Sequence, residues 1–321
     1  MIWLSEIILQ QTRVAQGLPY FLRFLDAFPE VSKLANASEE EVLKLWQGLG
    51  YYSRARNLHA AAKMVMENFD GKFPNSYNHL IKLKGIGVYT ASAIASFSSN
   101  EAVAVVDGNV YRVLSRIYGV FTPINSTEGE KEFKKLADSL LNKNNPAEHN
   151  QAIMEFGALA CTPKKASCEY CPFNKECYAY TNNVVDQLPV KIKKIKVRKR
   201  YFNFVLIKNA DQTILLQKRN EKDIWQHMYQ FPLIESDAVL ASAEAKRKIA
   251  ELGVETEKIK LLYRLEKPHK LSHQHIFADF YEVEVVNFNE INADYLKTPL
   301  ASLDSFPVPV LISNFLESYV F

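Results

Sequence analysis

The chain has only four cysteines, and they lie close together between residues 161 and 177. They are Cys161, Cys168, Cys171 and Cys177, and their spacing is C-x6-C-x2-C-x5-C. Short turns across such gaps can bring thiolates to one metal centre. Structural zinc sites usually combine two CxxC pairs, or one pair with two histidines, so this looser set favours one [4Fe-4S] cluster. Zinc is the alternative, and buried cysteines without a metal are a weaker one.

Two carboxylates occupy positions where their ionisation can differ. Glu6 lies within the apolar segment IWLSEIIL, and a carboxyl desolvated by such neighbours has a raised pKa and can hold a proton for donation. Asp107 precedes GNVYRVLSR, where it can cap a helix whose N-terminus keeps a carboxylate ionised. An ordinary surface glutamate and a purely structural cap are the alternatives, and the residue types alone leave both open.

The length and composition are those of a globular protein with two domains. The chain has 321 residues, 48% of them hydrophobic, and a formal net charge of +3. The start MIWLSEIILQQ lacks the basic region of a signal peptide, and no run of 18 apolar residues occurs. We therefore expect no membrane segment, a cytoplasmic location and reduced thiols rather than disulfides.

The hydrophobic pattern changes near the middle of the chain. Residues 1–185 predict an all-α domain, because apolar residues recur at three- and four-residue intervals in SEEEVLKLWQGLG, SRARNLHAAAKMVMENF and EGEKEFKKLADSLL. Residues 200–321 predict an α+β domain, with strands in YFNFVLI, TILLQKR and HIFADFYEVEVV and a helix in DAVLASAEAKRKIAEL that ends at Gly253. The segment VAVV before Asp107 is also typical of a strand.

A basic segment separates the two patterns. The sequence KIKKIKVRKR, residues 191–200, is dominated by lysine and arginine. It predicts a solvated linker over residues 186–199, which can also lie along a polyanion.

Residues 80–97, LIKLKGIGVYTASAIASF, predict two helices joined by a tight turn. Gly85 and Gly87 allow backbone amides and the start of the second helix to face a phosphate. Alone, this pattern fits a plain helical connection equally well. The order of residues in this segment, however, resembles the helix–hairpin–helix of DNA glycosylases, and the cysteine motif follows downstream. Together they resemble the endonuclease III superfamily.

Further motifs are similar to MutY-type adenine DNA glycosylases. They are WLSEIILQQT (3–12), GLGYYSRARNLH (48–59), VDGNVYRVLSR (106–116) and NQAIMEFGALACTP (150–163). Members of that family carry about one more helix before WLSE, so we expect this sequence to begin inside the catalytic helix. A misassigned start, a fragment and a divergent form are the three explanations.

The resemblance implies roles for the residues near the two carboxylates. It makes Glu6 the general acid that protonates adenine and Asp107 the carboxylate that stabilises the sugar cation. Tyr89 stands where bifunctional relatives carry a lysine, and a phenol cannot form a Schiff base, so the enzyme is expected to be monofunctional. Mismatch thymine glycosylases also carry a tyrosine there. Asn109 is implied as a supporting group and Gln151 as a contact to adenine.

The resemblance also implies the residues that contact DNA. Gln11 and Tyr51 match residues that enter the base stack when a nucleotide is extruded. Gln10, Thr12 and Leu49 lie beside them, and Gly85 and Gly87 belong to the hairpin. For Tyr51, a core aromatic position is the alternative.

The C-terminal segment resembles the MutT-like (Nudix-like) domain of the same family. It lacks the REXXEE helix of metal-dependent Nudix hydrolases, which leaves recognition as its expected role. The segment HKLSHQH, residues 269–275, matches the loop that probes 8-oxoguanine. Ser272 and His273 fit that loop, and Leu271 replaces a common phenylalanine. Without the resemblance, the histidines fit an exposed strand entry equally well.

The sequence thus predicts a multidomain protein. A helix–hairpin–helix glycosylase domain covers residues 1–185 and holds the iron–sulfur loop 161–177, a basic linker follows over 186–199, and a MutT-like domain covers 200–321. We expect a monomer that acts on nucleoid DNA carrying adenine opposite 8-oxoguanine or guanine. A lesion-binding protein without catalysis and a mismatch thymine glycosylase are the competing hypotheses.

Overall fold

The computed structural model describes residues 1–192, 197–254, 258–288, 291 and 294–319. Its contacts divide the chain into two compact units. The first unit contains residues 1–35 and 60–194, and the second contains residues 36–59 and 195–321. Residues 36–59 thus group with the C-terminal half, although their helical pattern predicts membership of the first domain. No helix within the described residues is long and apolar enough to cross a membrane.

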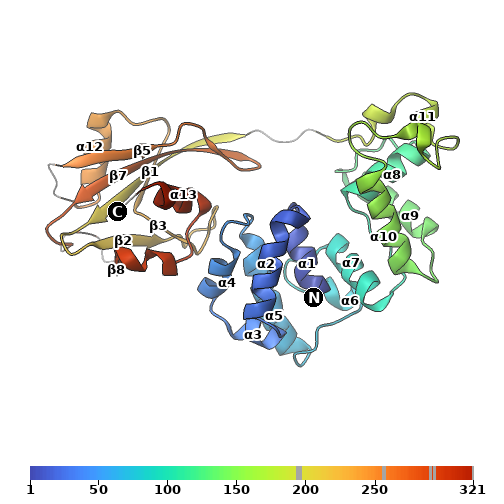
Figure 1. The fold of residues 1–321 in the computed structure, drawn as a ribbon, viewed down its shortest axis with the longest axis horizontal. Coiled ribbons are helices and arrows are strands. Elements are labelled where there is room, and N and C mark those ends of the chain that lie inside the picture. Colours follow the sequence, from blue (N-terminus) through green and yellow to red (C-terminus); the bar gives the residue numbers. More distant parts are fainter. Residues whose placement is uncertain (193–196, 255–257, 289–290, 292–293, 320–321) are drawn as a thin grey trace. The chain divides into compact units, whose positions relative to one another are not determined.

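The first unit is built from helices (Figure 1). They are α1 (Ile2–Leu9), α2 (Val14–Ala27), α3 (Val31–Asn36), α6 (Tyr77–Leu80), α7 (Val88–Ser99), α8 (Gly108–Tyr118), α9 (Thr127–Leu140), α10 (Pro146–Leu159) and α11 (Tyr178–Thr181). Helix α5 (Ser53–Asn68) has its residues 53–59 in the second unit and the rest in the first. Short 3-10 turns occur at Cys168–Tyr170 and Val185–Gln187. The helices predicted over 53–69 and 128–141 are confirmed, whereas the VAVV segment before Asp107 is irregular and not a strand.

Helix α7 is the central helix of this unit. Its residues from Thr90 to Ser96 are all buried, which explains why the segment uses alanine and serine: small side chains let neighbouring helices approach on every side. Helices α1, α6 and α10 all pack against it. Because α1 and α7 are in contact, residues that are far apart in the sequence can meet at their interface.

The second unit combines one N-terminal helix with a mixed sheet. Its elements are α4 (Glu39–Trp46), β1 (Arg198–Lys208), β2 (Thr213–Lys218), β3 (Tyr229–Gln230), β4 (Leu233–Ser236), α12 (Ser242–Ala250), β5 (Ile259–Arg264), β6 (His269–Lys270), β7 (Gln274–Glu284), β8 (Leu296–Pro299) and α13 (Val310–Ser318), with a 3-10 helix at Leu300–Ser305. The order along the sheet is β3-β2-β1-β7-β5. Strands β1 and β7 are parallel and pair from Arg198–Gln274 to Lys208–Glu284.

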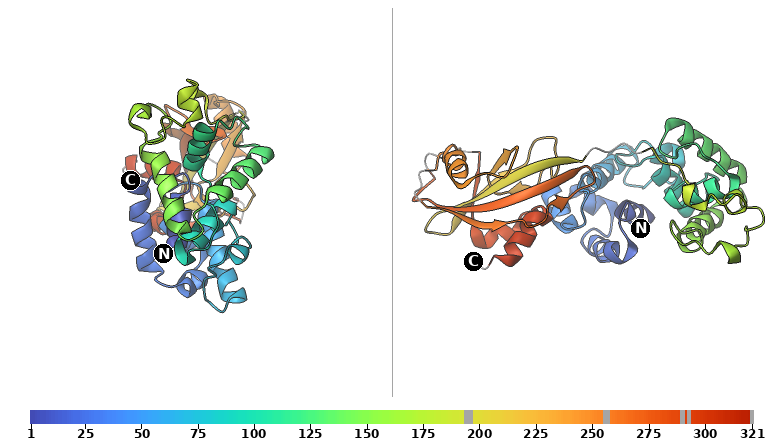
Figure 2. Two further views of the ribbon diagram at one scale, coloured as in Figure 1. Left: turned by 90° about the vertical axis from the view of Figure 1, so that its right-hand side faces the viewer. Right: turned by 90° about the horizontal axis from the view of Figure 1, so that it is seen from above.

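Alternate residues of β1 and β7 face opposite sides of the sheet, and each side is covered by a helix (Figure 2). On one side Val205, Ile207 and Val283 pack with Ile249 of α12. On the other side Phe280 stacks on Phe315 of α13, with ring centroids 4.1 Å apart. The predicted strands and the predicted helix before Gly253 are confirmed. Helices α12 and α13 pack on opposite faces of the sheet.

Polar contacts fix α4 within the second unit. Ser38 and Glu41 form a capping box at its start. Glu40 accepts hydrogen bonds from Lys218 Nζ at 2.7 Å and from Tyr229 Oη at 2.6 Å, and Lys44 Nζ donates to the carbonyl of Phe306 at 3.2 Å. These contacts explain why residues 36–59 belong with the sheet.

The structure shortens the expected basic linker. Asn125 exchanges hydrogen bonds of 2.9 Å with the backbone of Ile192, so the chain up to that point is held by the helical unit. Strand β1 already begins at Arg198. Residues 193–196, the centre of the basic segment, lie outside the described residues.

The close packing of α10 against α8 predicts that a larger side chain at Gly157 destabilises the protein. Gly157 of α10 is buried, and a Cβ there would lie 2.7 Å from Cβ and 3.0 Å from the carbonyl oxygen of Asn109. We expect Gly157→Ala to lower the free energy of unfolding by about 1–3 kcal/mol, because α10 must move away from the start of α8.

Thermal unfolding measures this effect. Gly108→Ala is the matched control, since a Cβ at Gly108 meets no atom within 4 Å. Equal melting temperatures for the two variants would contradict the packing argument.

Candidate active site and DNA-contact residues

Asp107 is the N-cap of α8, as the sequence predicts. Its Oδ1 accepts hydrogen bonds from the backbone amides of Asn109 at 2.9 Å and Val110 at 2.8 Å. Its Oδ2 accepts from Asn109 Nδ2 at 2.8 Å. These three hydrogen bonds fix the orientation of the carboxyl group at the start of the helix. Asp107 is therefore suited to stabilise a positive charge that develops nearby.

Glu6 is partly buried on α1, and Tyr89 of α7 donates a hydrogen bond of 3.0 Å to its Oε2. Burial raises the pKa of Glu6, the nearby negative charge of Asp107 raises it further, and the hydrogen bond from Tyr89 partly opposes both. No lysine, arginine or histidine in the described ranges forms a salt bridge with Glu6. The Glu6 carboxyl is thus biased toward its protonated form.

Tyr89 stays protonated beside this carboxyl. Burial raises its pKa well above the usual value, and the negative charge of Glu6 adds to the effect. Its hydroxyl donates to Oε2 of Glu6, so the other carboxyl oxygen, Oε1, is the one that can hold the acidic proton. The structure therefore brings together Glu6, Tyr89 and Asp107, three of the residues that the sequence analysis selected.

Asn150 holds the segment that leads to Asp107, and its role was missed in the sequence. Its side chain is 1% exposed. Its Oδ1 accepts from the amide of Val105 at 3.0 Å, and its Nδ2 donates to the carbonyl of Val103 at 2.9 Å. A polar residue at a buried position of α10 was the available signal. The adjacent Gln151 is exposed, and its contact to adenine stays a prediction.

Two further residues missed in the sequence connect α8 to the cysteine segment. Arg112 Nη2 donates to Asn109 Oδ1 at 2.9 Å, and its Nε donates to the carbonyl of Cys161 at 2.6 Å. One turn later, Arg116 Nη1 donates to the carbonyl of Thr162 at 2.8 Å and lies 3.4 Å from Cys161 Sγ. Helix α8 thus supports Asp107 at its start and the cysteine segment along one face.

All four cysteines line one cavity, together with Arg116, Phe156 and Asn174. Burial raises the pKa of the Cys168 thiol, and the negative charge of the neighbouring cysteines adds to the rise. Within the described residues, no group of three or more histidine, cysteine or acidic side chains is arranged to hold a single metal ion. Four sulfurs placed around one cavity are a donor set that fits a cluster with one thiolate per iron.

The predicted hairpin lies between α6 and α7. Gly85 has a φ of +75°, the left-handed region that favours glycine. Gly87 is the N-cap of α7 and makes no side-chain cap. The first amides of α7 therefore lack an intrahelical acceptor, as at other anion-binding helix starts.

Residues 10–12 form the turn between α1 and α2. Gln11 is exposed and has a φ of +56°. Gln10 Nε2 donates to Thr90 Oγ1 at 3.1 Å, and Thr12 Oγ1 donates to the carbonyl of Gln10 at 3.3 Å. The neighbours of Gln11 are thus held against the protein while its own side chain faces solvent.

In the second unit the structure brings Tyr51 to the predicted recognition loop. Tyr51 has a φ of +49°, and its ring is 49% exposed. Its hydroxyl lies 2.8 Å from Ser272 Oγ, and either atom can be the donor. Leu271 is half-buried and His273 is exposed in the turn between β6 and β7. The side chain of Leu49 is only 4% exposed, so it packs in the core, and a contact between this side chain and DNA is not supported.

Three segments of this unit line a cavity of about 600 Å³. They are residues 50–53, residues 222–225 and residues 269–274. Sequence reasoning missed the middle segment, which contains the buried Trp225. The cavity is thus lined by two regions that the sequence predicts to contact DNA and by the segment 222–225, which no sequence motif marked.

Two family descriptions match separate parts of the chain. The HhH-GPD superfamily base excision DNA repair protein family matches residues 4–139, and the NUDIX domain family matches residues 203–318. Among solved structures, a thermostable thymine-DNA glycosylase is similar with a TM-score of 0.53 and 26% identity, covering 56% of this chain and 83% of that one. An endonuclease III–DNA complex is similar in fold, with a TM-score of 0.51 and 21% identity over 57% of this chain and 84% of that one.

Curated relatives extend the similarity across both units. The adenine DNA glycosylase of Buchnera aphidicola subsp. Schizaphis graminum is 37% identical over 272 residues, which cover 85% of this chain and 76% of the relative. The adenine DNA glycosylase of Mus musculus is 43% identical over 180 residues, 56% of this chain and 35% of the relative. The chain therefore belongs to the adenine DNA glycosylase (MutY-type) family, with a helix–hairpin–helix glycosylase domain and a Nudix-like domain.

Proposed function

We propose that this chain hydrolyses the N-glycosidic bond of adenine paired with 8-oxoguanine or guanine, in base excision repair. The proposal takes it to act as a monomer on DNA in the cytoplasm. Its central support is the Glu6–Tyr89 hydrogen bond beside the Asp107 cap. One carboxyl has a raised pKa and can hold a proton, and the other is fixed by hydrogen bonds at a helix start, which suits the two roles that purine excision needs.

In this mechanism Glu6 donates its proton from Oε1 to a ring nitrogen of the extruded adenine. Protonation makes the base a better leaving group, and the bond to the sugar breaks with oxocarbenium character. The ionised Asp107 stabilises that cation electrostatically, or adds to it transiently before water completes hydrolysis. Asn109 keeps Asp107 in place through its hydrogen bond to Oδ2.

The cysteine segment has a structural role in this proposal. Cys161, Cys168, Cys171 and Cys177 would hold one [4Fe-4S] cluster in the cavity that they line. The cluster, when bound, supplies a rigid cross-link of this segment rather than a reactive group. Arg112 and Arg116 then connect the segment to α8.

Recognition of the opposite base is assigned to the second unit. Leu271, Ser272 and His273 form the turn that would probe 8-oxoguanine, and Tyr51 enters the stack beside it. The hydrogen bond between Tyr51 and Ser272 supports a shared role for the two segments. Gln11 and the hairpin glycines Gly85 and Gly87 contribute backbone and wedge contacts from the first unit.

The two competing hypotheses are less well supported. Adenine glycosylase relatives are 37–43% identical to this chain, whereas the thymine-DNA glycosylase structure is 26% identical over a smaller part of it. A binder without catalysis would not need the pairing of Glu6 with Tyr89 that the chain retains.

The acid role of Glu6 predicts the behaviour of a variant. In Glu6→Gln we expect the single-turnover rate on adenine opposite 8-oxoguanine to fall by about 100- to 10,000-fold, the range for loss of a general acid. Because the pKa of Glu6 is raised, the wild-type rate should be constant at low pH and fall as pH rises through that pKa. The exposed Glu67→Gln is the control. A wild-type rate in Glu6→Gln, or a rate that rises with pH, would contradict this role.

The phenol at residue 89 predicts the absence of a lyase step. Borohydride added during turnover should trap no covalent complex with DNA, because no amine stands at this position to form an imine. Strands should break only after alkali. Gel electrophoresis checks both, with a known bifunctional glycosylase as the positive control, and efficient trapping of this chain would refute the monofunctional assignment.

The cluster is tested by its spectrum and metal content. Anaerobically purified protein should contain iron and acid-labile sulfide in equal amounts and absorb in the visible range. Cys171→Ser should lose both, together with folding and DNA binding, whereas Ser167→Ala, in the same cavity lining, should keep them. Colourless, zinc-loaded protein with full activity would sink the assignment.

A further inference from the structure

Arg200 lies at the end of the basic segment, but its guanidinium is buried rather than facing solvent. It is 7% exposed and lies 4.7 Å above the ring of Phe202. Its Nε and Nη2 donate to the two carboxylate oxygens of Glu235 at 2.7 and 2.6 Å. Its Nη1 donates to Asp223 Oδ1 at 2.9 Å and to Gln274 Oε1 at 3.1 Å. All of these donors and acceptors belong to the second unit.

Arg200 belongs to a network of charged side chains. Arg219 Nη2 donates to Asp223 Oδ2 at 2.7 Å, and Arg198 Nη2 lies 3.7 Å from Glu235 Oε1, so three arginines face two carboxylates. The side chains of Arg200 and Arg219 are only 7% and 9% exposed, so the loss of a carboxylate would leave a buried positive charge without its partner. The planar guanidinium of Arg200 donates to three side chains at once, those of Glu235, Asp223 and Gln274, and a lysine cannot reproduce this geometry.

Arg200 thereby connects two of the three segments that surround the 600 Å³ cavity. Asp223 belongs to the segment 222–225, and Gln274 is the first residue of β7, directly after the turn 271–273. The third segment carries Tyr51, whose hydroxyl contacts Ser272 at the tip of the same turn. Arg200 thus links the first two segments by hydrogen bonds, in addition to the contact between the rings of Trp225 and His269, whose centroids lie 6.0 Å apart.

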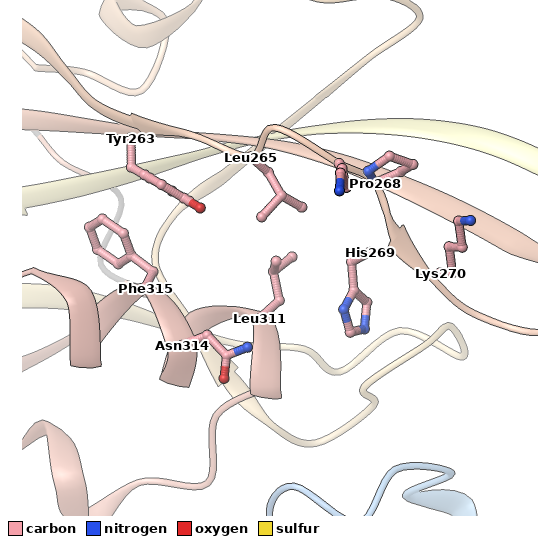
Figure 3. A pocket seen from close by; sticks show the side chains of 9 residues that line it. Tyr263, Leu265, Pro268, His269, Lys270, Leu311, Asn314 and Phe315 are labelled. Atoms are coloured by element: carbon pink, nitrogen blue, oxygen red, sulfur yellow. The ribbon is translucent and has the colours of Figure 1, made fainter.

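The backbone holds the turn to the sheet. The amide of Arg198 donates to the carbonyl of His273 at 3.0 Å, and the amide of Leu271 donates to the carbonyl of Gln274 at 2.8 Å. Strand β6 pairs with β7 through two residue pairs, His269 with Ile276 and Lys270 with His275. A second cavity of about 430 Å³ lies beside β6, where His269 and Leu265 face Leu311 and Asn314 of α13 (Figure 3). The side chain of Arg200 adds a hydrogen-bonded link from the end of the turn to Asp223, which these backbone contacts do not make.

We propose that Arg200 is a positioning residue for recognition of the base opposite the adenine, because it fixes the turn 271–273 relative to the segment 222–225. This inference rests on the proposed function and goes beyond it by assigning specificity to a residue that touches neither DNA strand. Loss of the connection would let the turn move, which weakens discrimination between 8-oxoguanine and guanine while leaving Glu6 and Asp107 unchanged.

The test compares single-turnover rates on duplexes with adenine opposite 8-oxoguanine and opposite guanine. In Arg200→Gln the ratio of the two rates should fall by about tenfold, the size expected for a lost charge-assisted hydrogen bond. The rate on the guanine duplex should stay within about twofold, because the proton donor is intact. Gln274→Met removes the contact of Arg200 to the end of the turn and keeps its pairs with Asp223 and Glu235, so it tests the inference if Arg200→Gln fails to fold.

Arg264→Gln is the matched control. Arg264 forms a similar two-bond pair with Asp279 on the same sheet, at 2.8 and 2.7 Å, but does not contact the turn. A ratio that falls in Arg200→Gln and Gln274→Met and stays in Arg264→Gln supports the inference. If Arg200→Gln and Gln274→Met keep the wild-type ratio, or if Arg264→Gln loses it equally, the inference about Arg200 is wrong. The proposed function would still stand in both cases. A wild-type chain without any preference for 8-oxoguanine overturns the proposed lesion specificity, and this inference with it.

Discussion

Partial burial of the Glu6 carboxyl makes its charged form less favourable, and its hydrogen bond from Tyr89 comes from a neutral phenol. Burial therefore raises the pKa of Glu6, and the hydrogen bond from Tyr89 to one oxygen opposes this only in part. This arrangement requires α1 to pack against α7. The small residues of α7 allow that contact, and in this way the core of the first unit creates the acid.

Helix α8 relates the second carboxylate to the rest of the unit. Its first amides hold the carboxyl group of Asp107, and Arg112 and Arg116 lie on the face that meets the cysteine segment. Gly157 of α10 lets α10 approach Asn109 closely enough to keep this end of α8 in place. Chemistry at Asp107 and the integrity of the cysteine segment therefore depend on one helix. The second unit also contains a buried arginine, Arg200, which donates hydrogen bonds to Asp223 and Gln274.

Sequence reasoning could predict features that are local in the chain. The Asp107 cap, the hairpin glycines and the strands of the second unit follow from short patterns, and the structure contains each of them. Contacts between distant residues left no such signal. Asn150, Arg112 and Arg200 were missed, because burial of a polar side chain depends on packing that no local pattern specifies. The grouping of residues 36–59 with the sheet was missed for the same reason.

The proposed chemistry depends on the protonation state of Glu6. Carbon-13 NMR of side-chain carboxyl groups, assigned with Glu6→Gln, can follow the titration of this group in the folded protein. We expect Glu6 to titrate at higher pH than the exposed glutamates, and at still higher pH in Tyr89→Phe, because the hydrogen bond from Tyr89 lowers the pKa of Glu6. A Glu6 that titrates with or below the exposed glutamates would contradict the proposed division of roles between the two carboxylates.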